Sequence, residues 1–102
     1  MRRGEIWWHE PPEQKRRPVL VLTRDEALGQ LNKLVAAPAT GTIRGIASEI
    51  RVGPDDGMPR ESVISLDNTT LVQKALLTER ITTLGVEKMS DVCRALNYAT
   101  GC

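Results

Sequence analysis

The chain has 102 residues and is poor in aromatic side chains: two tryptophans, one tyrosine and no phenylalanine. A core built around aromatic rings is therefore excluded, and Val, Ile, Leu and Ala must supply most of it. We expect a single domain spanning residues 1–102, because a chain of this length is small even for one domain. A homodimer would help such a chain to bury more of its surface. The composition, with 40% apolar and 26% charged residues, is that of a folded globular protein.

Cysteine and histidine are also scarce, since only Cys93, Cys102 and His9 are present. Two cysteines do not make a disulfide framework, and no Cys/His spacing predicts a metal site, so we expect neither a metal nor another cofactor. A Ser-His-Asp triad would have to use His9 and is poorly supported. No apolar run is long enough for a signal peptide or a membrane span, so we expect a reducing, cytoplasmic location and no membrane contact.

Charge of either sign shows no large excess, since 14 basic and 13 acidic residues leave a net charge of +1. The distribution is less even, because residues 1–24 hold six basic and three acidic side chains. A basic front end on a neutral body hints at an anionic ligand, and a solvated surface is the alternative.

Short apolar runs alternate with turn signals along most of the chain. This pattern predicts a mainly β fold, a small antiparallel barrel or curled sheet of five to seven short strands. The expected strands are Glu5–His9, Pro18–Thr23, Leu34–Ala39, Ile46–Val52, Ser62–Asp67, Thr69–Gln73 and Arg80–Leu84. Single helical turns are expected within Arg24–Lys33 and Lys74–Glu79.

The last element is an amphipathic helix, which makes the fold α+β. Its apolar residues recur at helical spacing, and Gly85 and Gly101 bracket the segment. The expected packing face consists of Val86, Met89, Val92, Cys93, Leu96 and Ala99.

Two strand ends carry side chains suited to phosphate. Lys15, Arg16 and Arg17 precede the strand that starts at Pro18, and a guanidinium anchored there can grip two phosphate oxygens at once. Thr40 ends the next strand, where its hydroxyl could donate to a phosphate oxygen. The alternatives are a solubilising basic loop and a turn-capping threonine.

The roles of the other polar and aromatic residues each have two interpretations. Asp67 and Asn68 end a further strand and could read base edges or cap a turn. Trp7 and Trp8 point to opposite faces of their strand, so one is expected in the core, and the other could stack on an unpaired base or lie in a dimer interface. For His9 we favour an exposed strand-end residue without a role over an acid/base group.

The order of these motifs resembles the MazF/PemK (Kid) toxins of toxin–antitoxin systems. The matching stretches are Arg3-Gly4-Glu5-Ile6-Trp7, Glu13-Gln14 followed by Arg17-Pro18-Val19-Leu20-Val21-Leu22, Pro38–Thr40, Ser62-Val63-Ile64-Ser65-Leu66-Asp67-Asn68 and Arg80-Ile81-Thr82-Thr83-Leu84-Gly85. They cover nearly the whole chain.

The resemblance implies an SH3-like curled barrel, a homodimer and a cognate antitoxin protein as partner. It also implies metal-independent, sequence-specific cleavage of single-stranded RNA, chiefly mRNA. Arg17 matches the family's catalytic arginine, Thr40 its catalytic threonine, and Asp67 an acidic position used for substrate contact or catalysis. The products would be a 2′,3′-cyclic phosphate or 3′-phosphate and a 5′-hydroxyl, with the RNA 2′-hydroxyl as nucleophile.

The remaining candidates follow from that implied reaction. Glu13 and Asp67 are the candidate bases, Lys15 and Arg16 would attract the RNA backbone, and Gln14, Asp67 and Asn68 would contact substrate. This sequence departs from the family at three places: its Glu13–Pro18 stretch is one residue shorter and lacks glycine, Pro12 replaces a histidine, and Ser65 stands where some relatives have a catalytic arginine. A CcdB-like toxin that binds DNA gyrase without catalysis, and a structural dimer with a basic rim, are the competing functions.

Overall fold

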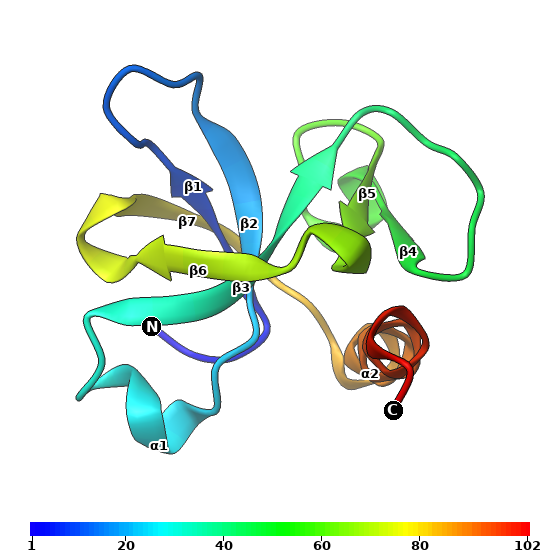
Figure 1. The fold of residues 1–102 in the computed structure, drawn as a ribbon. Coiled ribbons are helices and arrows are strands. Elements are labelled where there is room, and N and C mark those ends of the chain that lie inside the picture. Colours follow the sequence, from blue (N-terminus) through cyan, green and yellow to red (C-terminus); the bar gives the residue numbers. More distant parts are fainter.

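The polypeptide forms a curled antiparallel sheet of seven strands with a helix packed against one face, seen in a computed structural model that describes all 102 residues (Figure 1). The strands are β1 (Glu5–His9), β2 (Arg17–Val21), β3 (Lys33–Thr40), β4 (Glu49–Val52), β5 (Ser62–Ser65), β6 (Thr70–Gln73) and β7 (Leu77–Thr83). The helices are α1 (Asp25–Leu28) and α2 (Val86–Thr100), and 3₁₀ turns cover Pro54–Asp56, Leu66–Asn68 and Lys74–Leu76. The predicted fold class is confirmed.

Strand β3 is shared between the two halves of the sheet. The strand order is β4-β5-β3-β2-β1-β7, and β6 also pairs with β3. The first half of β3, from Lys33 to Ala36, pairs with β6, whereas Ala39 and Thr40 pair with β5. Figure 1 shows β3 running between the β1–β2–β7 half and the β4–β5 half. Because one long strand changes partner along its length, the sheet curls and leaves the ends of β2 and β3 open to solvent.

The alternation of side chains along β2 separates two hydrophobic cores. Leu20 belongs to a cluster of 12 buried residues on the face covered by α2, and Val19 and Val21 belong to a cluster of seven on the opposite face. The prediction that this strand is covered on both faces is confirmed. Trp7 packs against the smaller cluster, as expected of the core tryptophan.

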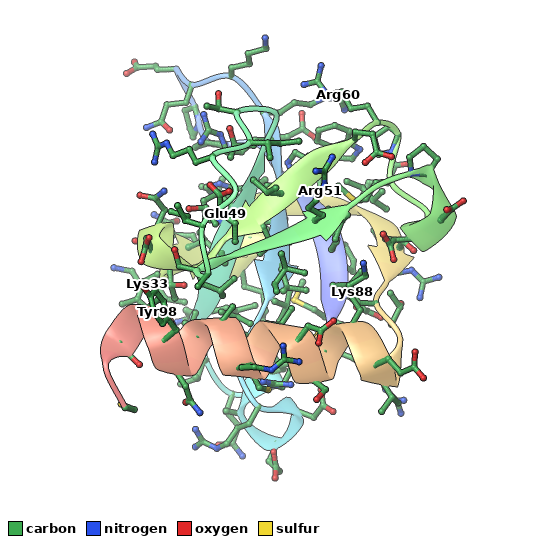
Figure 2. The ribbon with its side chains drawn as sticks, turned by 90° about the vertical axis from the view of Figure 1, so that its right-hand side faces the viewer. Lys33, Glu49, Arg51, Arg60, Lys88 and Tyr98 are labelled. Atoms are coloured by element: carbon green, nitrogen blue, oxygen red, sulfur yellow. The ribbon has the colours of Figure 1, made fainter.

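Helix α2 lies on the sheet as predicted, but its packing face is rotated (Figure 2). Val92 and Ala95 are buried, and Met89, Leu96 and Ala99 pack beside them. The expectation that Val86 and Cys93 belong to this face was wrong: Val86 is 88% exposed and Cys93 is also exposed. Val86 is the first residue of the helix, and the packing face is centred on Val92 and Ala95 instead.

Three predicted strand boundaries were also wrong. β4 begins at Glu49 rather than Ile46, because the Glu49 Oε1 atom accepts hydrogen bonds from the backbone amides of Arg44 and Gly45, both at 3.0 Å, and this holds the chain in a loop. β5 ends at Ser65, and its continuation turns as a 3₁₀ segment. β7 starts at Leu77 because the preceding helical turn is shorter than expected.

Candidate active site

His9, Arg17 and Thr40 form a row across the open ends of three neighbouring strands. His9 of β1 pairs with Arg17 of β2. The β2–β3 ladder ends at the pair Val19–Pro38, and Arg17 and Thr40 are the end residues of these two strands just beyond it. Neighbouring strands lie about 4.8 Å apart, and residues of one row point to the same face. The sheet thus presents an imidazole, a guanidinium and a hydroxyl side by side.

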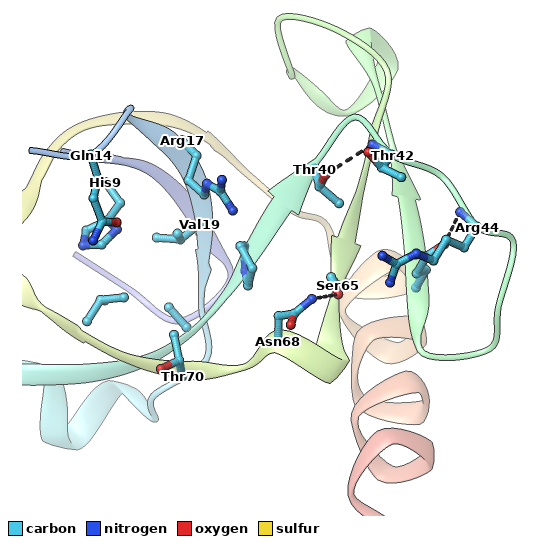
Figure 3. Close-up of a pocket in the computed structure, with 14 residues that line it drawn as sticks. His9, Gln14, Arg17, Val19, Thr40, Thr42, Arg44, Ser65, Asn68 and Thr70 are labelled. Carbon is cyan, nitrogen blue, oxygen red and sulfur yellow. Dashed lines mark hydrogen bonds between the residues drawn. The ribbon is translucent and has the colours of Figure 1, made fainter. Parts of the chain in front are cut away.

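This row borders a pocket of about 490 Å³, which we call the front pocket (Figure 3). Its apolar lining is Val19, Ala36, Pro38 and Val72, alternate residues of β2, β3 and β6. Its other lining residues are polar or charged: His9, Gln14, Arg17, Thr40, Thr42, Arg44, Glu49, Ser65, Asn68 and Thr70. An apolar floor ringed by polar groups is suited to a ligand that has both flat apolar surfaces and hydrogen-bonding edges.

The Thr40 hydroxyl is oriented by the backbone. The amide of Thr42 donates to Thr40 Oγ1 at 3.2 Å, so one lone pair of that oxygen is used (Figure 3). Its hydrogen is then left to donate into the pocket, because a hydroxyl carries one donor and two acceptor sites. The turn-capping and ligand-binding interpretations of Thr40 are therefore compatible.

Arg17 is exposed and has no acidic partner. The three ion pairs of the protein are Arg80–Glu5, Lys88–Asp56 and Arg94–Asp91, and none involves a basic residue of the front pocket. An unpaired guanidinium keeps its donors available for an anion. In Figure 3 the Arg17 side chain points into the hollow between β2 and β3.

Asn68 and Asp67 are neighbours with different surroundings. Asn68 lines the front pocket, and its Nδ2 donates to Ser65 Oγ at 2.8 Å, which fixes the amide and leaves its carbonyl oxygen as an acceptor. Asp67 does not line this pocket, and its Oδ2 accepts from Ser48 Oγ at 2.5 Å. Of this predicted pair, the structure brings only Asn68 to the row of strand ends.

The predicted site residues of the β1–β2 loop lie at two different hollows. Gln14 lines the front pocket, whereas Lys15 and Arg16 line a second hollow that also contains Arg17 and Thr40. Glu13 lines neither; it is exposed and has a left-handed backbone with φ of 67°. Neither candidate base from the sequence, Glu13 or Asp67, therefore faces the front pocket.

His9 and Arg44 also line the pocket, although neither is among the predicted site residues. The expectation that His9 is an exposed residue without a role was wrong about its position: it is half-buried beside Arg17. Burial, and then the positive charge of Arg17, lower the pKa of the His9 imidazole below its ordinary value. His9 could have been predicted from the β1–β2 hairpin. Its position beside Arg17 depends only on where the two strands begin to pair.

Arg44 comes from the loop between β3 and β4. Its side chain points toward the pocket, and its backbone amide is one of the two held by Glu49 (Figure 3). No residue of Arg24–Lys33 lines the pocket.

No group of three or more His, Cys, Asp or Glu side chains is arranged to hold a metal ion. No helix is both long and apolar enough to cross a membrane.

Known proteins are similar to this chain over nearly its whole length. The probable endoribonuclease MazF5 of Mycobacterium tuberculosis is 45% identical over 101 residues, which are 98% of this chain and 93% of that protein. The probable endoribonuclease MazF2 of the same organism is 35% identical over all of both chains. The solved structure of the M. tuberculosis toxin MazF-mt6 superimposes with a TM-score of 0.87 at 32% identity, covering 95% of this chain and 96% of the other. Residues 2–100 also match the family model described as PemK-like, MazF-like toxin of type II toxin–antitoxin system, and the chain belongs to that family.

Proposed function

We propose that this protein is a toxin endoribonuclease that cuts single-stranded RNA, chiefly mRNA, at specific sequences without a metal ion. One observation carries the proposal: Arg17, which has no acidic partner, and Thr40, whose oxygen accepts from the Thr42 amide, line the same polar pocket at the ends of neighbouring strands. Family membership and the names of the two curated relatives support the same activity.

The RNA supplies its own nucleophile, the 2′-hydroxyl next to the scissile phosphate. Its oxygen bonds to phosphorus while the bond from phosphorus to the 5′ oxygen breaks, and the products are a 2′,3′-cyclic phosphate and a 5′-hydroxyl. Negative charge grows on the phosphoryl oxygens during this step. Arg17 and the Thr40 hydroxyl hold that charge from fixed positions, which is the largest contribution a protein makes to such a reaction.

A base must take the proton of the 2′-hydroxyl, and we assign this role to His9. Glu13 and Asp67 lie outside the front pocket, and the Glu49 Oε1 oxygen accepts two backbone amides. His9 lines the pocket next to Arg17, and its lowered pKa leaves the imidazole neutral at neutral pH. A neutral imidazole can accept a proton, and the departing 5′ oxygen takes one from solvent.

The remaining residues contact substrate. Gln14, Asn68 and Arg44 have amide or guanidinium groups at the pocket wall, where they can hydrogen-bond to the edges of an unpaired base. Lys15 and Arg16 attract the phosphate backbone from the other side of Arg17.

We further propose that residues 1–102 are one domain that acts in the cytoplasm as a homodimer and is blocked by a cognate antitoxin. The family description supports the antitoxin. Exposed apolar side chains on the β3–β4 loop support a protein interface, since Ile43 is 38% and Ile46 is 44% exposed.

The test is incubation of the protein with a long single-stranded RNA in EDTA, followed by mapping of the new 5′ ends. We expect cuts at a recurring sequence that leave 5′-hydroxyl ends. A substrate with deoxyribose at the cut position should resist. Activity that requires a divalent ion, or equal cutting of the deoxy substrate, would contradict the mechanism; gyrase inhibition without any cuts would indicate the CcdB-like alternative.

A further inference from the structure

A second hollow, which we call the rear hollow, lies behind the Arg17–Thr40 pair on the opposite face of the sheet. Trp8 of β1 pairs with Pro18 of β2, and the β2–β3 register places Pro18 opposite Ala39. These three residues line the rear hollow, which has a volume of about 280 Å³. Arg17 and Thr40 line both hollows, so they stand on the ridge between them.

All the charged residues that line the rear hollow are cations. Lys15, Arg16, Arg17 and Arg60 surround it, and no carboxylate lines it. None of the four takes part in an ion pair. Arg16 is fixed above the Trp8 ring at 4.1 Å from its centroid, an arrangement that holds the cation in place rather than neutralising it. Like charges gathered this closely repel one another, and an anion in the hollow would relieve that repulsion.

Arg60 reaches the rear hollow from a different part of the chain. It precedes β5, and Figure 2 shows it at the end of the molecule opposite to α2. The β1–β2 loop and the segment before β5 therefore place their cations on two sides of one site.

A smaller hollow of about 40 Å³ shares Trp8, Thr40 and Arg60 with the rear hollow. Ser62 also lines it. Ser62 is only 5% exposed, and its Oγ is the one buried side-chain polar atom without a hydrogen-bond partner. Such groups are normally satisfied, because a missing partner is costly. A space of that size is large enough for a water-sized polar group.

We propose that the rear hollow binds the nucleotide that adjoins the scissile phosphate, with the far phosphate of that nucleotide held by Arg60 and a backbone oxygen bonded to Ser62. This inference rests on the proposed function, because the ligand is the same single-stranded RNA. The two nucleotides on either side of the cut then occupy opposite faces of the sheet. The RNA bends over the Arg17–Thr40 ridge, which exposes the phosphorus to the neighbouring 2′-hydroxyl.

Binding of RNA that cannot be cut provides the first test. The probe is a fluorescently labelled single-stranded RNA that contains the mapped cut site with deoxyribose at that position. Arg60→Gln should weaken binding about fivefold to tenfold and reduce the salt dependence of binding by about 0.7, the slope expected for one phosphate contact on a single strand. Arg24→Gln is the matched control, because Arg24 is exposed and lines none of these hollows, and it should bind like the wild type.

Ser62→Ala separates a ligand contact from a structural role. Removing an unpartnered hydroxyl should leave the melting temperature unchanged or raise it, so weaker binding by this variant cannot come from unfolding. We expect affinity to fall about twofold to tenfold. For both variants, KM on cleavable RNA should rise more than kcat falls.

Substrates with one uncharged methylphosphonate linkage identify the phosphate. One substrate carries the uncharged linkage one nucleotide to the 5′ side of the cut, and a second carries it one nucleotide to the 3′ side. On one of these two substrates, Arg60→Gln should bind as tightly as the wild type. The proposal is overturned if Arg60→Gln and Ser62→Ala bind like Arg24→Gln, or if neither linkage changes the effect. If the wild-type protein cuts no RNA, the proposed function is refuted. The RNA affinities of Arg60→Gln, Ser62→Ala and Arg24→Gln can still be compared on mixed-sequence RNA, because binding needs no cleavage.

Discussion

The two ends of strand β1 hold charged groups in opposite ways. At its start, Glu5 is 6% exposed, and its carboxylate accepts from Arg2 N and Trp7 Nε1, both at 2.9 Å, and from Arg80 Nη1 at 3.5 Å. At its other end, His9 adjoins Arg17, which is exposed and has no acidic partner. One end of β1 thus holds a partnered carboxylate, whereas the other end, four residues along the strand, adjoins an unpartnered guanidinium on β2.

The partnered charge at the Glu5 end serves stability, whereas the unpartnered charge at the Arg17 end is available for ligand binding. A buried carboxylate with three donors fixes the N-terminus to β1 and β7 and has no capacity left for a ligand. Exposed cations without partners contribute little to folding and keep their donors free. Changes at the Glu5 end should therefore alter stability, and changes at the Arg17 end should alter activity.

The largest expected effect is that of Arg17→Ala on cleavage. Loss of a donor that stabilises the charge of the transition state should lower the rate by about 10²–10³. The melting temperature should not change, because the Arg17 side chain is exposed and makes no ion pair. Single-turnover kinetics and thermal unfolding measure the two quantities, with Arg24→Ala as the exposed-arginine control. A folded Arg17→Ala protein with near-normal cleavage would break the comparison.

His9→Gln should lower the rate by about 10²-fold at neutral pH, because general-base catalysis is lost. The wild-type rate should be constant where His9 is neutral and should fall as the pH drops through the pKa of His9. That pKa lies below the ordinary value of about 6.5 because the side chain is buried and faces Arg17. Only Arg17 is charged among the residues that pair with His9, since its partner on β7 is Leu77.

The pH profile and an NMR titration of the single histidine check this assignment together. His9→Gln should remove the acid limb of the profile. Arg17→Gln should raise the pKa of His9, because the neighbouring cation is gone and burial remains. An unchanged acid limb in His9→Gln would mean that another group is the base.

Glu5→Gln should lower the free energy of unfolding by about 1–3 kcal/mol at pH 7. Burial alone would raise the pKa of the Glu5 carboxyl, but hydrogen bonds from Trp7 and Arg2 and the charges of the N-terminus and Arg80 outweigh it and lower the pKa. A carboxyl with a lowered pKa stabilises the fold above its unfolded value of about 4.3, and this contribution is lost as the pH falls through the lowered value.

The gap in stability between wild type and Glu5→Gln should accordingly narrow between pH 7 and pH 3 in urea unfolding. Cleavage by the folded fraction of the variant should stay normal. A loss of cleavage without a loss of stability would place Glu5 in the site and remove the contrast between the two ends of β1.

The sequence was sufficient for the elements that depend on local pattern. The ends of Glu5–His9, the double-faced strand after Pro18 and the C-terminal helix follow from alternation and helical spacing. Arg17 and Thr40, which were proposed as site residues because each stands at a strand end, line the same pocket. Their juxtaposition depends on the β2–β3 register, which local pattern does not encode.

Residues that reach the site from elsewhere were harder to find. Arg44 and Arg60 lie in loops whose paths depend on side-chain bonds such as those of Glu49. The buried, unpartnered state of Ser62 is a property of packing and leaves no trace in spacing. Residues on regular strands could therefore be predicted, and residues placed by loop conformation could not.

The smallest expected effect is that of Arg94→Ala, which tests whether any surface arginine would act like those at the strand ends. Arg94 is exposed on α2 and forms an ion pair with Asp91 three residues before it. Such a pair contributes at most about 0.5 kcal/mol to stability, and salt screens it. Arg94→Ala should leave both RNA affinity and its salt dependence unchanged while removing the same charge as Arg60→Gln. If both variants lower RNA affinity equally, RNA binding depends on net charge alone. If only Arg60→Gln lowers the affinity, binding depends on the position of that charge at the rear hollow.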